Sequence, residues 1–163
     1  MESKAAIRPM QQYSDRFDVQ RIEDSCFEHP WTEKDFDKYL RAKNIWGYVF
    51  EDEYGTVVGY IVYELHPFKL DVLNLAVHPE YRHRGFGRAL LGHVLERLSK
   101  EGVPRLTCMV RESNLDAQCF LRACGIRAVN VAKKHWANPD EDGYLFAKRQ
   151  EPDVKIEIDP KAG

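Results

Sequence analysis

The sequence lacks the features that define several classes of protein. No apolar stretch approaches the roughly 20 residues that a membrane-spanning helix requires. The 24 lysine and arginine residues are slightly outnumbered by 26 aspartates and glutamates, and a net charge of −2 argues against a general binder of nucleic acid or anionic membrane. The opening residues MESKAAIRPM contain no signal-peptide core. We therefore expect a cytoplasmic protein that binds neither nucleic acid nor a membrane.

Cysteine is scarce, and its placement excludes the common cysteine-based sites. The cysteines form no C-x-x-C pair and have no paired spacing with histidine that is typical of a metal site. We expect buried free thiols, as is usual in a reducing compartment, and no bound metal. The four residues are Cys26, Cys108, Cys119 and Cys124.

The chain has enough apolar residues for one packed domain. Of its 163 residues, 44% are hydrophobic and 31% are charged, as in ordinary globular proteins. Strand and helix signals alternate along the chain, without a repeat or an interdomain linker. The expected strands are 5–10, 46–52, 56–65, 71–79, 105–110 and 144–149, and the expected helices are 13–27, 29–40, 85–100 and 114–125. This order predicts one α/β domain over residues 1–149, followed by a polar tail, 150–163, that is loose or forms an added edge strand.

Short local signals mark some of the element boundaries. Phe17, Ile22 and Phe27 indicate an apolar stripe along the first helix. Thr32, with an aspartate three residues later, is typical of a capping box at the start of the second helix. Residues 52–55 are typical of a hairpin turn, and a glycine at residue 102 is placed to end the long helix.

The segment RHRGFGR, residues 82–88, concentrates positive charge and glycine where the long helix begins. The first turn of a helix has unpaired N–H groups and the positive end of the helix dipole, so it binds anions readily. Its two glycines allow the backbone to approach a ligand closely, and its three arginines add donors for phosphate oxygens. The spacing matches neither a dinucleotide-binding loop nor a P-loop. An anion site and an exposed basic turn are both open at this point.

A wider segment, LAVHPEYRHRGFGRALL, resembles the acyl-CoA-binding signature of the GNAT acetyltransferase superfamily. Arg82-x-x-Gly85-x-Gly87 matches the Gln/Arg-x-x-Gly-x-Gly/Ala pattern, and RLTCMVRESNLDAQCFLRACGI resembles the strand and helix that follow it. HPWTEKDF and KKHWANPDEDGYLFAKR are similar to segments of the ribosomal-protein alanine N-terminal acetyltransferases (RimI-like) and their eukaryotic relatives. The resemblance covers most of residues 6–149. It implies the GNAT fold, a mixed and strongly twisted central sheet with helices on both faces, splayed where the pantetheine arm lies.

The resemblance also implies acetyl-CoA as the co-substrate and assigns residues to it. In the family, the strand before the basic loop pairs its backbone with the pantetheine arm, and the loop and helix start bind the pyrophosphate. The corresponding residues are Leu75, Ala76, Val77, Arg82, His83, Arg84, Gly85, Phe86, Gly87, Arg88 and Asn114. The remaining partner would be a peptide or protein N-terminus or a small amine, bound by a monomer or homodimer.

The usual catalytic positions of these relatives are apolar in this sequence. The ribosomal-protein alanine N-terminal acetyltransferases use a glutamate base and a tyrosine acid, and the corresponding positions are Met109 and Leu121. Neither side chain can transfer a proton. Asp71, Glu112 and Tyr144 are weak alternatives that could act through water. The aromatic residues that fall in segments lining the acceptor groove of the family are Phe27, Trp31, Trp136 and Tyr144.

The missing base bears on the choice of acceptor. An α-amino group with a pKa of about 7.7–8.0 is roughly 10–20% neutral at pH 7, whereas a lysine amine with a pKa of about 10.4 is neutral about once in 2,500 molecules. The resemblance implies an acetyl-CoA-dependent N-acetyltransferase that transfers the acetyl group directly to a primary amine, and the comparison of pKa values places the α-amine of a protein or peptide N-terminus first among the acceptors. Two alternatives stay open: an acetyltransferase for small amines, and an acetyl-CoA-binding regulatory module that has lost catalysis.

Overall fold

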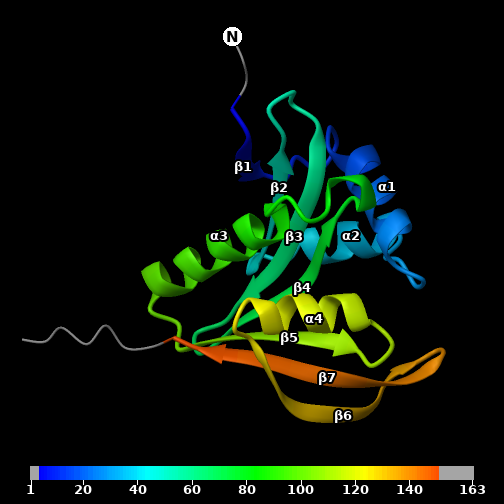
Figure 1. The fold of residues 1–163 in the computed structure, drawn as a ribbon, viewed down its shortest axis with the longest axis vertical. Helices are drawn as coiled ribbons and strands as arrows, with labels where there is room; N and C mark the ends of the chain where they lie inside the picture. The colour runs from blue at the N-terminus through cyan, green and yellow to red at the C-terminus, as the bar shows by residue number, and fades with distance from the viewer. Residues whose placement is uncertain (1–3, 151–163) are drawn as a thin grey trace, which may run out of the picture.

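The computed structural model describes residues 4–150, which form a seven-stranded sheet with helices on both faces (Figure 1). The strands are β1 (Ala6–Pro9), β2 (Ile45–Glu51), β3 (Val57–Leu65), β4 (Leu70–Val77), β5 (Arg105–Arg111), β6 (Arg127–Ala137) and β7 (Asp140–Arg149). The helices are α1 (Arg16–Cys26), α2 (Glu33–Leu40), α3 (Phe86–Glu101) and α4 (Leu115–Ala123), with a short 3-10 turn, η1 (Pro79–Tyr81), before α3. This arrangement confirms the fold class predicted from the sequence.

The sheet is open at its centre. The strand order is β1-β2-β3-β4-β5-β7-β6, and every neighbouring pair is antiparallel except β4 and β5, which are parallel. The parallel pairing extends over only three positions, the last of which is Val72↔Cys108. Beyond it, β4 continues to Val77 and β5 continues to Arg111 along separate courses (Figure 1). The sheet is therefore splayed between these two strands, as expected.

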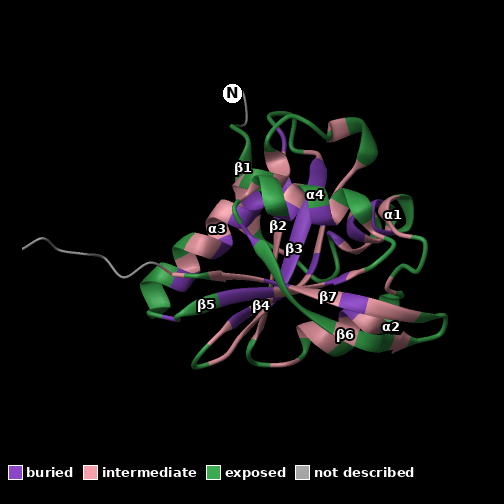
Figure 2. Ribbon diagram, turned by 60° about the horizontal axis from the view of Figure 1, so that its bottom comes forward, coloured by how far each residue is buried: buried purple, intermediate pink, exposed green. Residues whose placement is uncertain are grey.

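Two apolar cores hold the helices against the sheet. The first core takes from α3 and α4 the residues Leu90, Leu91, Val94, Leu98 and Leu121. The second core, on the opposite face, takes from α1 and α2 the residues Val19, Ile22 and Phe36. Each fully buried side chain of this size contributes roughly 1.5–3 kcal/mol. Figure 2 shows the buried residues concentrated along the central strands, β3 above all, so both cores meet at the middle of the sheet.

Several predicted boundaries are confirmed by their hydrogen bonds. Thr32 and Asp35 form the capping box of α2, in which each side chain accepts a bond from the backbone N–H of the other residue. Gly102 ends α3 in the left-handed conformation, with φ of 65°, which a glycine adopts without strain. In the predicted turn at 52–55, Asp52 Oδ1 accepts hydrogen bonds from the backbone N–H groups of Tyr54 and Thr56.

The structure contains one strand that the sequence pattern did not predict. β6 lies at the edge of the sheet, and most of its residues are exposed because no helix covers it. A strand exposed on both faces shows no apolar alternation, so its pattern carries no strand signal. Its partner β7 begins at Asp140, earlier than the predicted start at residue 144. The predicted tail beyond residue 150 lies outside the described residues.

Two packing expectations are wrong. Phe17 is 78% exposed, and the buried stripe of α1 consists of Val19, Ile22 and Glu23. Residues five apart in a helix lie about 140° apart around its axis, so Phe17 and Ile22 cannot share a face. The four thiols were expected to be buried, but Cys119 is exposed and the other three are half-buried. The buried residues of α4 are Gln118 and Leu121. In residues 4–150, no helix is long and apolar enough to cross a membrane.

Candidate functional site

The edge of β4 that faces the opening carries peptide groups that are not paired with another strand among the described residues. The N–H of His78 donates to Val58 O of the strand preceding β4, at 2.8 Å. Successive residues of an antiparallel strand direct their peptide groups alternately to the two sides, so Ala76 also faces β3. Leu75 and Val77 therefore direct their N–H and C=O groups toward β5, beyond the last paired position. Leu75, Ala76 and Val77 were expected to bind the pantetheine arm through their backbone. Leu75 and Val77 direct their peptide groups to where an extended ligand could pair with them.

The basic loop leads into a helix start that no side chain caps. His83 and Gly85 have φ values of 61° and 84°, and these two left-handed residues turn the chain into α3. Gly85 is the N-cap residue and lacks a side chain, and the first hydrogen-bonded amide of the helix is that of Ala89, 3.0 Å from Gly85 O. The N–H groups of residues 86–88 therefore have no partner within the helix. They form the donor set that the sequence predicted for an anion.

The three arginines of the loop lie around this helix start. Arg82 extends over the end of β4, where its Nε is 3.3 Å from Val77 O. The guanidinium carbon of Arg84 is 5.2 Å from the centre of the Tyr81 ring. Arg88 points toward the C-terminal end of α4. All three side chains are exposed, so each can turn toward an anion bound at the loop.

Side chains at the start of α3 and on α4 fix the shape of this region. A Cβ on Gly87 would lie 3.2 Å from the ring of Phe120, so α3 and α4 approach each other closely here. The ring of Phe86 stacks on Phe50, with 4.6 Å between centroids, and anchors the helix start in the first core. Asn114 accepts a backbone hydrogen bond through Oδ1 and caps α4. Phe86 can therefore offer a ligand its backbone rather than its ring.

The face of the sheet beneath α1 and α2 presents Met109. The neighbouring Val110 belongs to the first core, so Met109 points to the opposite face. A Cβ on Gly143 of β7 would lie 2.7 Å from Met109 Sδ and 3.1 Å from the ring of Trp136. The guanidinium carbon of Arg111 is 4.4 Å from the centre of that ring. The structure thus places Met109, which stands where the relatives have their base, beside Trp136.

An acidic residue holds this surface in place. Glu141 Oε2 is 2.9 Å from Arg111 Nη1, and Glu141 Oε1 accepts a hydrogen bond from the N–H of Ser113 at 2.8 Å. Hydrogen bonds from Ser113, followed by the interaction with Arg111, lower the pKa of Glu141 to about 2. Glu141 is also paired with Trp136 across the β6–β7 hairpin. The carboxylate therefore ties the hairpin that carries Trp136 to the end of β5.

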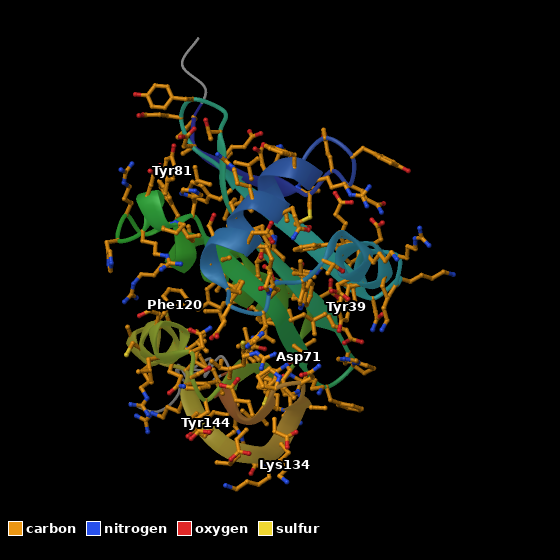
Figure 3. All side chains as sticks on the ribbon, turned by 90° about the vertical axis from the view of Figure 1, so that its right-hand side faces the viewer. Tyr39, Asp71, Tyr81, Phe120, Lys134 and Tyr144 are labelled. Atoms are coloured by element: carbon orange, nitrogen blue, oxygen red, sulfur yellow. The ribbon has the colours of Figure 1, made fainter. Side chains whose placement is uncertain are left out.

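Among the three alternative bases, Asp71 lies on the same face as Met109. Its Oδ1 accepts a hydrogen bond from Thr107 Oγ1 at 2.8 Å, and Thr107 and Met109 share a face of β5. Burial raises the pKa of Asp71, and the Thr107 hydrogen bond opposes this effect in part. Figure 3 shows Asp71 on the side where Tyr39 of α2 is labelled.

The other two alternatives form a pair on the opposite face. Tyr144 packs against the first core and donates a hydrogen bond to Glu112 Oε1 at 3.2 Å. Figure 3 shows Tyr144 on the side of Phe120 and α4. Leu121, at the usual acid position, is 3% exposed in the same core. The structure therefore does not bring Tyr144 or Glu112 to the face that carries Met109.

The remaining predicted aromatic residues lie in the loop between α1 and α2, residues 27–32, which we term the acceptor loop. Phe27 and Trp31 pack against the second core, on the same side of the sheet as Met109. The Trp31 ring stacks on Tyr39 at 4.5 Å between centroids and meets a second aromatic ring of α2 edge-to-face at 5.2 Å. The acceptor loop is thus held against α2 by aromatic contacts.

Glu23 is a residue of this region that the sequence reasoning missed. Its side chain is enclosed beneath the acceptor loop, with an exposed fraction of 1% for the residue. Burial raises the pKa of Glu23 to about 7, and hydrogen bonds from Trp31 and Asn74 oppose the rise. The signal was present in the sequence: four residues after Val19 and one after Ile22, an acid falls within the apolar face of a helix.

The cysteines are free thiols and form no site of their own. Cys26 donates to Val77 O at 3.3 Å, and burial raises the pKa of Cys108 to about 12. Over the described range, 4–150, no group of three or more histidine, cysteine, aspartate or glutamate residues is arranged to hold a metal ion.

Comparison with known proteins agrees with this geometry. Residues 16–126 match the model of the Acetyltransferase (GNAT) family. A Bacillus subtilis (strain 168) protein assigned provisionally as a ribosomal protein bS18-alanine N-acetyltransferase is 29% identical over 146 residues, which cover 90% of this chain and 96% of that protein. The ribosomal protein bS18-alanine N-acetyltransferase of Escherichia coli (strain K12) is 28% identical over 133 residues, 77% of this chain and 85% of that protein.

A solved structure shows the same fold. The crystal structure of the ribosomal-protein-S18-alanine N-acetyltransferase from Escherichia coli superposes with a TM-score of 0.77. The match covers 92% of this chain and 98% of that chain, at 23% sequence identity. At this identity the likeness concerns the path of the chain, and the roles of individual residues have to come from their chemistry.

Proposed function

Because this chain belongs to the GNAT acetyltransferase family and is an N-acetyltransferase that uses acetyl-CoA, we propose that its acceptor is the α-amino group of a protein or peptide N-terminus. The two relatives described above are named for the alanine of ribosomal protein bS18, so a small first residue such as alanine is the acceptor we propose here. Free thiols support a reducing, cytoplasmic location, which is part of the same proposal.

The residues around the opening offer the polar groups that this proposal assigns to acetyl-CoA. In this proposal the peptide groups of Leu75 and Val77 pair with the amide groups of the pantetheine arm, as a neighbouring strand would. The N–H groups of residues 86–88 and the arginines beside them hold the pyrophosphate. Acetyl-CoA, when bound, supplies a thioester carbonyl that an amine can attack. The missing Cβ of Gly87 lets α3 and α4 approach each other closely beside this path.

The proposal for the acceptor is carried by one observation, the apolar side chain of Met109 on the face beneath the acceptor loop. A surface without a base at this position favours an amine that arrives neutral. Neutralising an α-amine at pH 7 costs about 1–1.4 kcal/mol, whereas neutralising a lysine amine costs about 4.6 kcal/mol. Asp71 lies on the same face and is the residue that could accept a proton through water.

A panel of matched acceptors tests the proposed function. One peptide has a free N-terminal alanine and no lysine, a second has the same sequence blocked at its N-terminus with one lysine added, and a polyamine represents small acceptors. Release of the coenzyme A thiol is measured at pH 7. The free α-amine should react at least about 100-fold faster than the lysine, as the neutral fractions imply. Faster reaction of the blocked peptide or of the polyamine would contradict the proposal, as would no turnover with any of them.

A further inference from the structure

Glu23 connects three separate elements through its carboxylate. Oε1 accepts a hydrogen bond from the backbone N–H of Trp31, in the acceptor loop, at 2.8 Å. Oε2 accepts one from Asn74 Nδ2 of β4 at 2.9 Å and another from the hydroxyl of Tyr60 of β3. Both oxygens of the carboxylate are therefore used, and each bond leads to a different part of the fold.

Packing alone does not require an acid at this position. Val19 and Ile22 flank Glu23 on the buried face of α1, so an aliphatic residue would continue the apolar stripe. Enclosing a carboxylate costs several kcal/mol unless its hydrogen bonds compensate for the lost water. A buried acid whose bonds reach three elements therefore specifies the positions of those elements.

The element held at one end is the acceptor loop. The carbonyl of Trp31 accepts a hydrogen bond from Gln20 Nε2 at 2.8 Å, so the N–H and the C=O of Trp31 are both held by side chains of α1. The Trp31 ring is in turn stacked on α2. The backbone of the loop is thus fixed at this tryptophan, and Glu23 provides one of its two attachments.

The element held at the other end is β4, at the point where its edge opens. Asn74 follows a bulge at Leu73, where the register between β3 and β4 shifts. It directly precedes Leu75, whose peptide groups face the opening. A carboxylate bonded to both Trp31 and Asn74 therefore spans from the loop proposed for the acceptor to the strand proposed for acetyl-CoA.

We propose that Glu23 is a positioning residue that holds the acceptor loop in register with the open edge of β4 and thereby sets the affinity for the acceptor peptide. This inference rests on the proposed function. Glu23 acts through Trp31 and Asn74 and does not contact the substrates itself. The basic loop and α3 make no hydrogen bond to Glu23 among the described residues, so acetyl-CoA affinity should not depend on it.

Steady-state kinetics with an alanine-initiated peptide test this role. Glu23→Leu fills the same space without the hydrogen bonds, and Glu23→Gln retains an acceptor for the N–H of Trp31. Glu96→Gln is the control, because Glu96 is an exposed acid on α3, away from the acceptor loop and from the start of the helix. We expect Glu23→Leu to raise the peptide KM at least tenfold, Glu23→Gln to raise it by a smaller factor, and Glu96→Gln to leave it within twofold of wild type. The Kd for acetyl-CoA, measured by calorimetry, should stay within twofold in all three.

The outcomes separate this inference from the function on which it rests. An unchanged peptide KM in folded Glu23→Leu, or an equal loss of affinity for peptide and acetyl-CoA, would overturn the positioning role while leaving the acetylation of N-termini intact. No peptide acetylation by the wild-type chain would overturn both. If the Glu23 variants do not fold, Asn74→Ala breaks the link at β4 alone, and it must raise the peptide KM with unchanged acetyl-CoA affinity or the inference is wrong.

Discussion

Met109 is apolar at a position where a carboxylate is expected, and Glu23 is a carboxylate at a position where an apolar side chain is expected. Met109 lies on the face proposed for the acceptor, where a carboxylate could accept a proton. Glu23 lies on the buried face of a helix, where an aliphatic side chain would pack without loss of hydration. Both lie on the α1–α2 side of the sheet, and each has its own consequence for how the protein responds to pH.

The apolar side chain at position 109 leads to an expectation for the pH dependence of catalysis. We expect kcat/KM to rise with pH along the titration of the substrate amine, because no carboxylate at position 109 accepts its proton. Met109→Glu should raise activity near pH 7 by about tenfold, below the 10²–10⁴-fold of a fully positioned base, because no partner is arranged to orient the new carboxylate. Met109→Gln, of similar size and without charge, is the control. Rate profiles of the three proteins across pH provide the measurement.

A wild-type profile with a plateau set by an enzyme group of pKa about 6–7 would contradict this expectation. The same profile measured in Glu23→Gln then identifies the group. A plateau that persists in that variant indicates a base on the enzyme, with Asp71 as the first residue to replace. A plateau that disappears indicates that ionisation of Glu23 controls the turnover.

Glu23 also contributes to how stability depends on pH. Burial and the charges of Asp24 and Asp35 raise its folded-state pKa from 4.5 to about 7, against the hydrogen bonds from Trp31 and Asn74. The folded state therefore binds this proton more tightly than the unfolded chain does. The stabilisation by protonated Glu23 is complete below pH 4.5 and is lost as the pH rises through about 7. The expected loss is about 3 kcal/mol.

Urea unfolding of wild type and Glu23→Gln between pH 4.5 and 8 measures this loss. The difference in the free energy of unfolding between the two proteins should change by about 3 kcal/mol over that range, with wild type losing stability toward the alkaline end. Glu28→Gln removes an exposed acid and should run parallel to wild type. Parallel curves for wild type and Glu23→Gln would mean that the pKa of Glu23 is the same in the folded and unfolded states.

At the scale of elements, α3 begins differently from the helices beside it. The side chains of Thr32 and Asn114 cap α2 and α4, and each satisfies an amide of the first turn. α3 begins at Gly85, which offers no such acceptor. α1 also lacks a side-chain cap hydrogen bond, but its N-cap residue is the acid Asp15, whereas the free amides of α3 occur beside Arg82, Arg84 and Arg88.

Adding a negative charge at this helix start should remove acetyl-CoA binding. Gly85→Asp is the variant to test, because a Cβ there meets no atom within 4 Å, whereas a Cβ on Gly87 would displace Phe120. Gly85→Asn introduces the same strain at a φ of 84° without the charge, and it should bind acetyl-CoA more tightly than Gly85→Asp does. A carboxylate about 4–5 Å from a phosphate costs roughly 3–4 kcal/mol at an effective dielectric constant of about 20, a loss of at least ~100-fold in affinity. Gly92→Asp adds the same charge within α3, also without a steric contact, and should bind normally. Calorimetry that finds equal affinity for Gly85→Asp and Gly92→Asp would refute the anion site.

At the scale of the whole molecule, the sheet consists of two parts joined by three paired positions of β4 and β5. We expect bound acetyl-CoA to occupy the gap and to slow hydrogen–deuterium exchange at the amides of Leu75 and Val77. The amide of Ala76 faces β3 and serves as an internal control whose exchange should change little. Residue-resolved exchange with and without saturating acetyl-CoA is the measurement. Unchanged exchange at Leu75 and Val77 would contradict the proposed strand-like pairing.

The parts of the fold that sequence patterns predicted depend on neighbouring residues. The capping box at Thr32 and the stop at Gly102 are local, since their partners lie within a few positions along the chain. β6 was not predictable in this way, because an uncovered edge strand has no buried face to mark its period. Its backbone pairs with β7, through a register that shifts twice.

Some residues of the candidate site were likewise predictable from their neighbours in the sequence, and others were not. The loop at residues 82–88 was recognisable because its glycines and arginines lie close together in the sequence. The face on which Tyr144 lies depends on its pairing with Val110 across β5 and β7, which no local pattern reveals. Glu23 required the three-dimensional positions of Trp31 and Asn74, which are 8 and 51 residues away along the chain. The sequence alone did not determine the contacts between residues that are far apart along the chain.

The proposed pairing of β4 with the pantetheine arm involves main-chain atoms, and this affects how the site tolerates mutation. The side chains of Leu75 and Val77 pack against the first core, so their identity is constrained by volume rather than by the ligand. Exchange among aliphatic residues leaves every N–H and C=O in place, and proline is the residue that removes a donor. Related proteins can therefore keep such a site although the aliphatic residues at these two positions differ. The site would be lost when the backbone of the strand changes its path.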